Sequence, residues 1–308
     1  MTSEKAMEKI RQQMRNARAN APWVEKDAME VPGVGEKSTI VVFGAGASLQ
    51  RFEKALPKIA RSCLTVVSPT VARWFRDHAG CDPDVMVNVD FHPSLVERAE
   101  KSGMARSIPT VLSPVVAPQW TDWAVNPYWF LNVMHTDTGD FDNHPFTWAL
   151  TNLFQNIKTR VQQMGCVTIE ALWLAMLWGH AMSSAVTNIV MAGGDFAFWH
   201  GLARVPDDRH DGYPTALEFG GVDDGITWRG YQTNKRMLAY AQQLAIIQKQ
   251  VHMRLWNMSD GPANDYLPRI DGRHVINGHF PKYWTDTKVE VECQKFIDAY
   301  NGMMEPIR

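Results

Sequence analysis

The fold is decided by a stretch that reads TIVVFGAGASL, residues 39–49. Its first five residues are mostly β-branched and are followed by glycine, which predicts a buried strand. The glycines at 44 and 46 predict a tight turn, and Ser48 is placed to cap a helix that continues to about residue 59. A strand, a glycine turn and a helix in this order are typical of the first unit of a parallel α/β sheet.

The same alternation continues along the chain. Strands are predicted at 64–67 and 85–89, with a helix at 71–78 between them. We therefore expect a Rossmann-like, doubly wound, mostly parallel sheet with helices on both faces. The later elements predicted are a short strand at 110–112, a helix at 168–177, a buried strand at 188–192, a helix at 231–250 and a last strand at 251–256.

Three segments fall outside this alternation. Residues 1–21 have apolar side chains at helical spacing and predict an amphipathic helix. Residues 118–147 are rich in Trp, Asn, Asp, His and Pro and predict a long ligand-facing or lid-like insertion, while 201–229 predict a polar loop. We divide the chain into an N-terminal helical arm at 1–37, a Rossmann-like core domain at 38–270 and a C-terminal extension packing on the core at 271–308.

The composition describes a globular chain with balanced charge. Of its 308 residues, 45% are hydrophobic, which is enough for a full core. The formal net charge of -2 does not indicate nucleic acid or an anionic membrane as partner, although it leaves room for a local basic cleft. No apolar run approaches the length of a membrane span and no secretory signal is visible, so we expect a cytoplasmic location. A homo-oligomer is compatible with these features.

The glycine turn is the first candidate site. Gly44 and Gly46 let the backbone approach a ligand, and the start of the next helix offers unpaired N–H groups to a phosphate or carboxylate. The turn lacks the third glycine of a dinucleotide fingerprint and the lysine of a P-loop. The alternative is a tight turn without a ligand.

Polar residues follow three of the predicted strands. Asp90 and Asp195 each come just after a buried strand, where ligands bind in open α/β sheets, so the two could face each other across one crevice. His200 is a candidate general base because imidazole titrates near neutrality. Asn257 and Ser259 follow the last strand and are candidates for contact with a base or sugar. The alternatives are a helix or turn cap for Asp90, an Asx turn for Asn257 and a surface position for His200.

Metal ligands are only weakly indicated. The four cysteines are scattered without a CxxC pair, which disfavours a zinc site and fits a reducing compartment. If the chemistry depends on Mg2+, Asp90 and Asp195 are the expected ligands. A further patch rich in His and Asp has spacing that fits no standard zinc set; it comprises His135, Asp137, Asp140, Asp142 and His144.

Five segments, taken in order, resemble the family of 6-hydroxymethylpterin diphosphokinase MptE-like proteins. That family includes the core domain of the motility accessory factors that glycosylate flagellin. Each motif is loose, but their order is fairly specific, and the resemblance spans about residues 38–270. The segments are VVFGAGASL (41–49), CDPDVMVNVDFHP (81–93), GCVTIEALWLAMLWG (165–179), NIVMAGGDFAF (188–198) and VHMRLWNMSDGP (251–262).

The resemblance implies a Rossmann-like fold related to bacterial sialyltransferases that use CMP-sugars. It implies that the turn binds nucleotide or phosphate, that Asp90 and Asp195 line the donor and acceptor crevice, and that Asn257 and Ser259 lie beside it. Two positions depart from the family pattern, because Ala47 stands where proline is usual and Gly194 where glutamine is common. The turn residues concerned are Gly44, Ala45, Gly46, Ala47 and Ser48.

These observations support three functional hypotheses. The first is a glycosyltransferase that moves a sugar from a nucleotide-sugar to a hydroxyl acceptor, with Asp195 or His200 as base. The second is a diphosphokinase that uses ATP and Mg2+ on a hydroxymethylpterin-like alcohol. The third is a binding protein that keeps a nucleotide fold without catalysis. A protein side chain, a glycan, a small molecule and a modified DNA base are all compatible acceptors.

Overall fold

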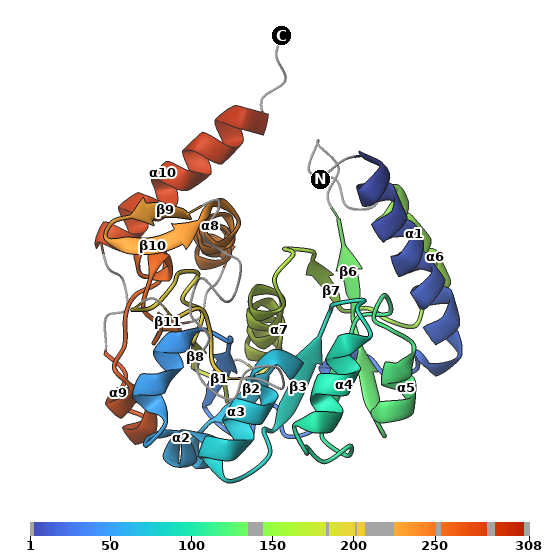
Figure 1. Cartoon of the computed structure of the whole chain (residues 1–308), viewed down its shortest axis with the longest axis horizontal. Helices are drawn as coiled ribbons and strands as arrows, with labels where there is room; N and C mark the ends of the chain where they lie inside the picture. The colour runs from blue at the N-terminus through green and yellow to red at the C-terminus, as the bar shows by residue number, and fades with distance from the viewer. Residues whose placement is uncertain are drawn as a thin grey trace.

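Seven parallel strands form the central sheet of the computed structural model (Figure 1). The structure describes residues 3–134, 144–182, 185–200, 202–206, 225–250, 254–281 and 287–304. Within these residues the strands lie in the order β11 (Arg254–Asn257), β8 (Asn188–Ala192), β1 (Thr39–Phe43), β2 (Leu64–Val67), β3 (Val85–Asn88), β4 (Thr110–Leu112) and β5 (Pro127–Trp129).

The sheet reverses its direction of growth between β1 and β8. From β1 the chain builds β2, β3, β4 and β5 toward one edge and then returns to place β8 and β11 on the other side. Val41 pairs with Thr65 of β2 and with Val190 of β8, so β1 is central and all five of its residues are buried. In open α/β sheets such a switch point is where ligands bind, at the carboxyl ends of the strands. The predicted doubly wound fold is confirmed.

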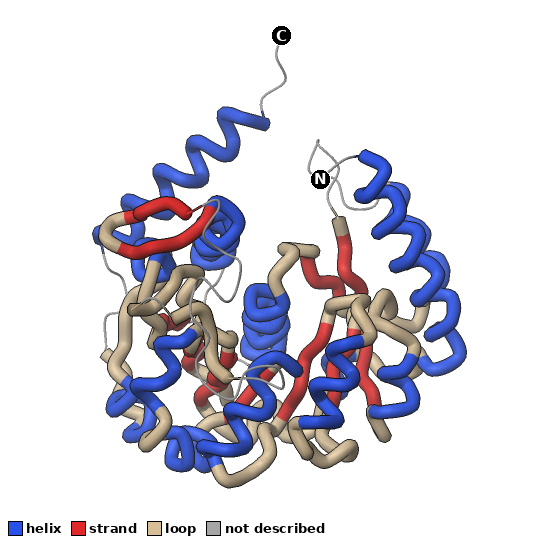
Figure 2. Tube along the Cα trace, in the orientation of Figure 1, coloured by secondary structure: helices blue, strands red, loops and turns tan. Residues whose placement is uncertain are grey.

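Helices cover both faces of the sheet (Figure 2). Alternate residues of β1 point to opposite sides, so Val41 and Phe43 join one apolar core and Ile40 and Val42 join the other. The first core receives α1 (Ser3–Asn20), α2 (Leu56–Ser62), α3 (Pro69–Ala79), α4 (Ser94–Lys101), α5 (Gln119–Trp123), α6 (Pro145–Leu153) and α9 (Gly272–Asn277); the second receives α7 (Val167–Ala181), α8 (Lys235–Gln250) and α10 (Thr287–Met304).

The N-terminal helix is fastened to the loop that follows β4. Asn16 donates its side-chain amide to the carbonyl of Val115 at 3.0 Å. Asn20 donates to the carbonyls of Pro114 and Val116 at 2.8 and 2.9 Å. Figure 1 shows α1 beside α6, at the same side of the molecule as β6 (Leu131–Val133) and β7 (Arg160–Gln162). Short 3-10 turns, η1 (Ala21–Trp23) and η2 (Ala28–Glu30), continue the chain toward β1. The predicted helix at 1–21 is confirmed, and it packs on the core.

The structure differs from the prediction in two segments, one directly after the glycine turn and one at the edge of the sheet. The chain leaves the turn in a 3-10 helix, η3 (Ala47–Phe52), and α2 begins only at Leu56. The prediction of one continuous helix to about residue 59 was therefore wrong. Ser48 does not cap η3, whose first flanking residue is Gly46. The expected insertion at 118–147 instead supplies the edge strand β5 and a strand of a second parallel pair, β6 (Leu131–Val133) with β7 (Arg160–Gln162).

The segment before α8 forms a hairpin rather than the start of a helix. Strands β9 (Gly225–Trp228) and β10 (Tyr231–Asn234) pair antiparallel around Arg229 and Gly230, which both have positive φ as a two-residue hairpin turn requires. The Asn234 side chain then accepts from the Met237 amide at 2.8 Å and starts α8. The helix predicted at 231–250 therefore begins four residues later than expected.

The predictions for the last strand, the C-terminal region, the polar loop and the His/Asp patch can be compared with the structure in part. The last strand is described at Arg254–Asn257, and residues 251–253 of its predicted range lie outside the described residues. The C-terminal region adds η4 (Pro262–Asp265), α9 and α10 to the core. Most of the polar loop predicted at 201–229, and four members of the His/Asp patch, lie outside the described residues; the fifth, His144, accepts from the Phe146 amide at 3.2 Å and caps α6. Within the described ranges, no helix has the length and apolar character needed to cross a membrane.

Candidate functional site

The glycine turn packs directly against the turn that follows β8. Gly44 donates its amide to the carbonyl of Ala192 and Gly46 donates to that of Gly193, both at 2.7 Å. A Cβ on Gly44 would lie 2.5 Å from the Gly193 carbonyl oxygen, and a Cβ on Gly46 would lie 2.5 Å from the carboxyl group of Asp195. The glycines are needed because two backbone turns approach each other here.

Ser48 and Asp195 close this contact. Ser48 is fully buried and donates its amide to Asp195 Oδ2 at 2.8 Å and its hydroxyl to Oδ1. Burial raises the pKa of Asp195 to about 7, although the two bonds from Ser48 favour the charged form. Three of the five amides at residues 44–48 therefore donate to the protein. A phosphate at this turn would have to be held by other groups.

Asn257 and Ser259 connect a third turn to the same place. The Gly194 amide donates to Ser259 Oγ at 2.8 Å, and the Ser259 amide donates to Asn257 Oδ1 at 2.9 Å. Asn257 also donates to the side-chain oxygen of Asn264 at 2.9 Å, and both Asn257 and Ser259 are fully buried. The expected convergence with Asp195 is present, but these side chains bond to the protein.

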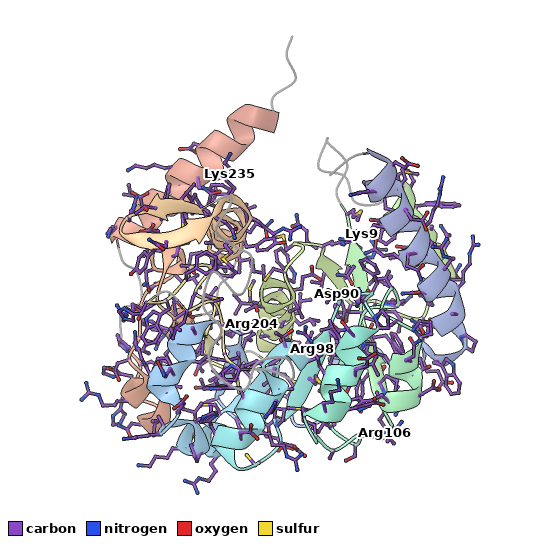
Figure 3. The ribbon with its side chains drawn as sticks, in the orientation of Figure 1. Lys9, Asp90, Arg98, Arg106, Arg204 and Lys235 are labelled. Atoms are coloured by element: carbon purple, nitrogen blue, oxygen red, sulfur yellow. The ribbon has the colours of Figure 1, made fainter. Side chains whose placement is uncertain are left out.

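Asp90 lies away from this cluster. Its strand, β3, is separated from β8 by β1 and β2, which at about 4.8 Å per strand places the two strand ends roughly 14 Å apart. Asp90 is exposed and accepts from the His92 amide at 3.0 Å, as a turn cap. In Figure 3 it is seen to the side of Arg204, whose neighbour Val205 donates to the carbonyl of Ala45 at 2.9 Å. Asp90 and Asp195 are therefore too far apart to bind one cation, contrary to expectation.

An open pocket of about 480 Å3 lies beside the buried cluster. One wall is the chain after β8 and the other is the hairpin, which are joined by the Phe198 amide donating to the Gln232 carbonyl at 2.7 Å. Thr233 adds a hydroxyl bond to the Phe196 carbonyl at 2.6 Å. The lining residues are Phe198, Trp199, His200, Gly230, Tyr231, Gln232 and Asp260.

Asp260 joins this pocket to a pair of arginines. Its carboxylate accepts from Arg51 and from the Trp199 indole N–H on Oδ2, the latter at 3.1 Å, and from Arg269 on Oδ1 at 2.8 Å. Two guanidinium groups against one carboxylate leave one positive charge beside the glycine turn. Sequence reasoning missed Asp260, Arg51 and Arg269. Asp260 follows Asn257 and Ser259 after the last strand, but no local pattern predicts its partners.

His200 is the predicted base that lies at the pocket. It is exposed, has a positive φ of 48° and stacks edge-on against Trp199 with 4.5 Å between ring centroids. The Trp199 indole N–H donates a hydrogen bond to Asp260, so the ring against which His200 packs is held in place. The described residues contain no cluster of three or more His, Cys, Asp or Glu side chains that could hold a metal ion.

A comparison with solved structures finds a fold neighbour. The MAf glycosyltransferase from Magnetospirillum magneticum AMB-1 matches with a TM-score of 0.54 and 14% sequence identity. The match covers 85% of this chain but only 37% of that chain, so this chain spans little more than a third of the neighbour's length. No protein-family model matches the sequence, and no curated protein matches it significantly. At this identity the likeness supports the α/β fold, and the MptE-like assignment stays a prediction.

Proposed function

We propose that this chain is a glycosyltransferase that moves a sugar from a nucleotide-sugar donor to a hydroxyl acceptor. The observation that carries the proposal is the pocket at the carboxyl edge of β8 and β11, next to the switch point, where an imidazole and a carboxylate stand among aromatic side chains. The fold neighbour, which is named a glycosyltransferase, supports the same reaction class. The donor nucleotide and the sugar are both open.

The positive groups near the glycine turn suit the donor phosphates. Arg51 lies on η3 directly after the turn, and the buried Arg204 is adjacent in the chain to Val205, which bonds to the turn at Ala45. The amides of Gly44, Gly46 and Ser48 each have a single N–H that already has a protein acceptor. A guanidinium has five N–H donors and can bond to a phosphate while it keeps a protein partner, so we assign the phosphate contacts to Arg51, Arg204 and the amides of Ala45 and Ala47.

The transfer step can then be written with named groups. The acceptor hydroxyl oxygen attacks the anomeric carbon of the donor sugar. The bond from that carbon to the phosphate oxygen breaks, and the nucleotide leaves with the bonding electron pair. His200 takes the hydroxyl proton, because it is the exposed base at the pocket. Asp195 is a positioning residue, since it is buried and holds Ser48.

The diphosphokinase alternative needs carboxylates that hold Mg2+ between them. Asp90 and Asp195 were the expected ligands, and their strand ends are roughly 14 Å apart across three strand spacings. This separation favours the glycosyltransferase. The two reactions also differ in product, because pterin diphosphorylation releases AMP from ATP.

Nucleotide release tests the proposal. The protein is incubated with CMP-, UDP- and GDP-sugars, and with ATP plus a hydroxymethylpterin and Mg2+, and free nucleotide is measured by chromatography. We expect slow release of the nucleotide from one class of nucleotide-sugar, because water replaces the acceptor hydroxyl and hydrolyses the donor. His200→Gln should slow this release about 100-fold, whereas His180→Gln, an exposed position on α7, should leave it unchanged. Release of AMP alone, or of no nucleotide at all, contradicts the glycosyltransferase.

A further inference from the structure

The side chains that line the pocket at His200 indicate which class of acceptor it can bind. A general base must come within hydrogen-bond reach of the proton that it takes. If His200 is the base, as the proposed function has it, the pocket that His200 lines receives the acceptor. The class of acceptor can then be inferred from the other side chains of the same pocket.

The carboxylate of this pocket is already paired. Asp260 is the acidic side chain of its lining, and its two oxygens accept from Arg51, Arg269 and Trp199. Among the residues that the structure describes, the lining contains no Lys or Arg. A phosphorylated or nucleic-acid acceptor needs cations at the point of contact, and a cationic acceptor needs an uncommitted carboxylate. The lining therefore fits a neutral acceptor.

The rest of the lining is aromatic or an uncharged amide. Trp199 and Tyr231 are half-buried, so each presents part of a ring to the pocket while the remainder packs on the protein. Gln232 is exposed on β10 and offers an amide with both donors and an acceptor. Gly230 adds no side chain at the hairpin tip, and a Cβ there would meet no atom of the described residues within 4 Å.

We propose that the pocket is an acceptor subsite for a neutral pyranose, so that the acceptor is a glycan. One face of a pyranose is lined by C–H groups and packs on an aromatic ring, while its hydroxyls both donate and accept hydrogen bonds. Tyr231 or Trp199 supplies the ring, Gln232 supplies the amide, and His200 lies where one hydroxyl loses its proton. The role of the bound sugar as acceptor rests on the proposed function, whereas the binding of the sugar to this pocket does not depend on it.

Sugar binding without any nucleotide tests the subsite. Methyl glycosides of glucose, galactose, mannose and N-acetylglucosamine are titrated into the full chain and followed by saturation-transfer NMR, with inorganic phosphate as the charged probe. We expect at least one glycoside to bind in the millimolar range and phosphate not to displace it. Tyr231→Ala should weaken this binding about tenfold, while Tyr231→Phe keeps the ring and the affinity. Trp148→Ala, at an exposed tryptophan on α6, is the matched control and should bind as the wild type does.

The outcomes separate the two proposals. Circular dichroism of Tyr231→Ala shows whether the variant is folded, and Gln232→Ala at an exposed position gives a second, independent loss of affinity. If no glycoside binds at tens of millimolar, or if Tyr231→Ala and Gln232→Ala bind as the wild type does, the sugar subsite is overturned even when nucleotide release is observed. If a glycoside binds and depends on Tyr231 but no nucleotide is released from any donor, the subsite stands as a sugar-binding site and the glycosyltransferase proposal fails.

Discussion

Ser48 and Asp195, which are 147 residues apart in the chain, bond through two donors of Ser48 to the two carboxylate oxygens of Asp195. The contact fixes the turn after β1 against the turn after β8, at the switch point of the sheet. It explains why the turn contains glycines, because a Cβ on Gly46 would meet the Asp195 carboxyl group. The segment that follows Asp195 in the chain, residues 198–200, then forms one wall of the pocket at His200.

Removal of the Ser48 hydroxyl should destabilise the fold. Ser48→Ala leaves Asp195 Oδ1 without this donor in a fully buried place, which costs about 2 kcal/mol of the free energy of unfolding. Urea denaturation measures the loss. Ser107→Ala, at an exposed serine, should change the free energy of unfolding by less than about 0.5 kcal/mol. Equal stability of the two variants contradicts the structural role of the Ser48–Asp195 contact.

Two buried carboxyl groups should make stability depend on pH. Burial raises the pKa of Asp195 and of Glu170 to about 7, from ordinary values of 3.8 and 4.5. The folded state holds these protons more tightly than the unfolded state, so their stabilising contribution is complete below the ordinary values and is lost as the pH rises through 7. We expect this contribution to fall by a few kcal/mol between pH 5 and pH 8.

Glu170→Gln should reduce that dependence while keeping the hydrogen bonds. Glu170 accepts from the amides of Met164 and Gly165 at 3.0 and 3.1 Å and from the side-chain amide of Asn132. Among the described residues Asn132 Oδ1 has no partner, so a flip of the Asn132 amide lets it accept from the new glutamine. Melting temperatures from pH 5 to pH 8 should vary less for Glu170→Gln than for the wild type. An unchanged slope shows that Glu170 does not titrate in this range.

The close approach of the two turns can be tested with an added methyl group. Gly46→Ala places a Cβ against the Asp195 carboxyl group and the Gly193 carbonyl, which should cost about 3 kcal/mol of the free energy of unfolding. For Gly80→Ala no atom of the described residues lies within 4 Å of the new Cβ, so the substitution costs only the strain of the left-handed backbone, about 1 kcal/mol. A Gly46→Ala protein as stable as the Gly80→Ala protein means that the turns are further apart than described.

The N-terminal helix should contribute to the stability of the core. Asn20→Ala removes two bonds to the carbonyls of Pro114 and Val116 in a buried place, at a cost of about 2 kcal/mol. Lys5→Ala on the exposed side of the same helix should leave the melting temperature unchanged. If Asn20→Ala melts at the wild-type temperature, the helix is an arm that the core does not need.

The central sheet was predictable because its signals are local. The β-branched runs at β1, β2, β3 and β8 are short, apolar and followed by turn residues, and each formed the expected strand. The hairpin was missed because Tyr231 and Thr233 favour a strand only when the tight turn at Arg229 and Gly230 is recognised before them. The strand β5 was missed because Pro127 and its neighbours lie in a segment of mixed composition.

The candidate site was predictable only in outline. Asp195, Ser48, Asn257 and Ser259 do meet, because the carboxyl ends of β1, β8 and β11 share one edge. Their bonding could not be foreseen, since whether Ser48 donates to a ligand or to Asp195 is decided by a contact distant in the sequence. Asp90 could not be placed either, because sequence order does not give the number of strands between β3 and β8.

Calorimetric titration of nucleotide-sugars into the wild type and Arg51→Gln measures whether a donor binds beside the glycine turn. Arg51 lies between the glycine turn and Asp260, so we expect that one of CMP-, UDP- and GDP-sugars binds and that Arg51→Gln weakens its affinity about tenfold or more. Arg61→Gln, at an exposed arginine on α2, should bind as the wild type does. No binding of any nucleotide-sugar, or equal affinity of the wild type and Arg51→Gln, would contradict a donor site at this edge of the sheet.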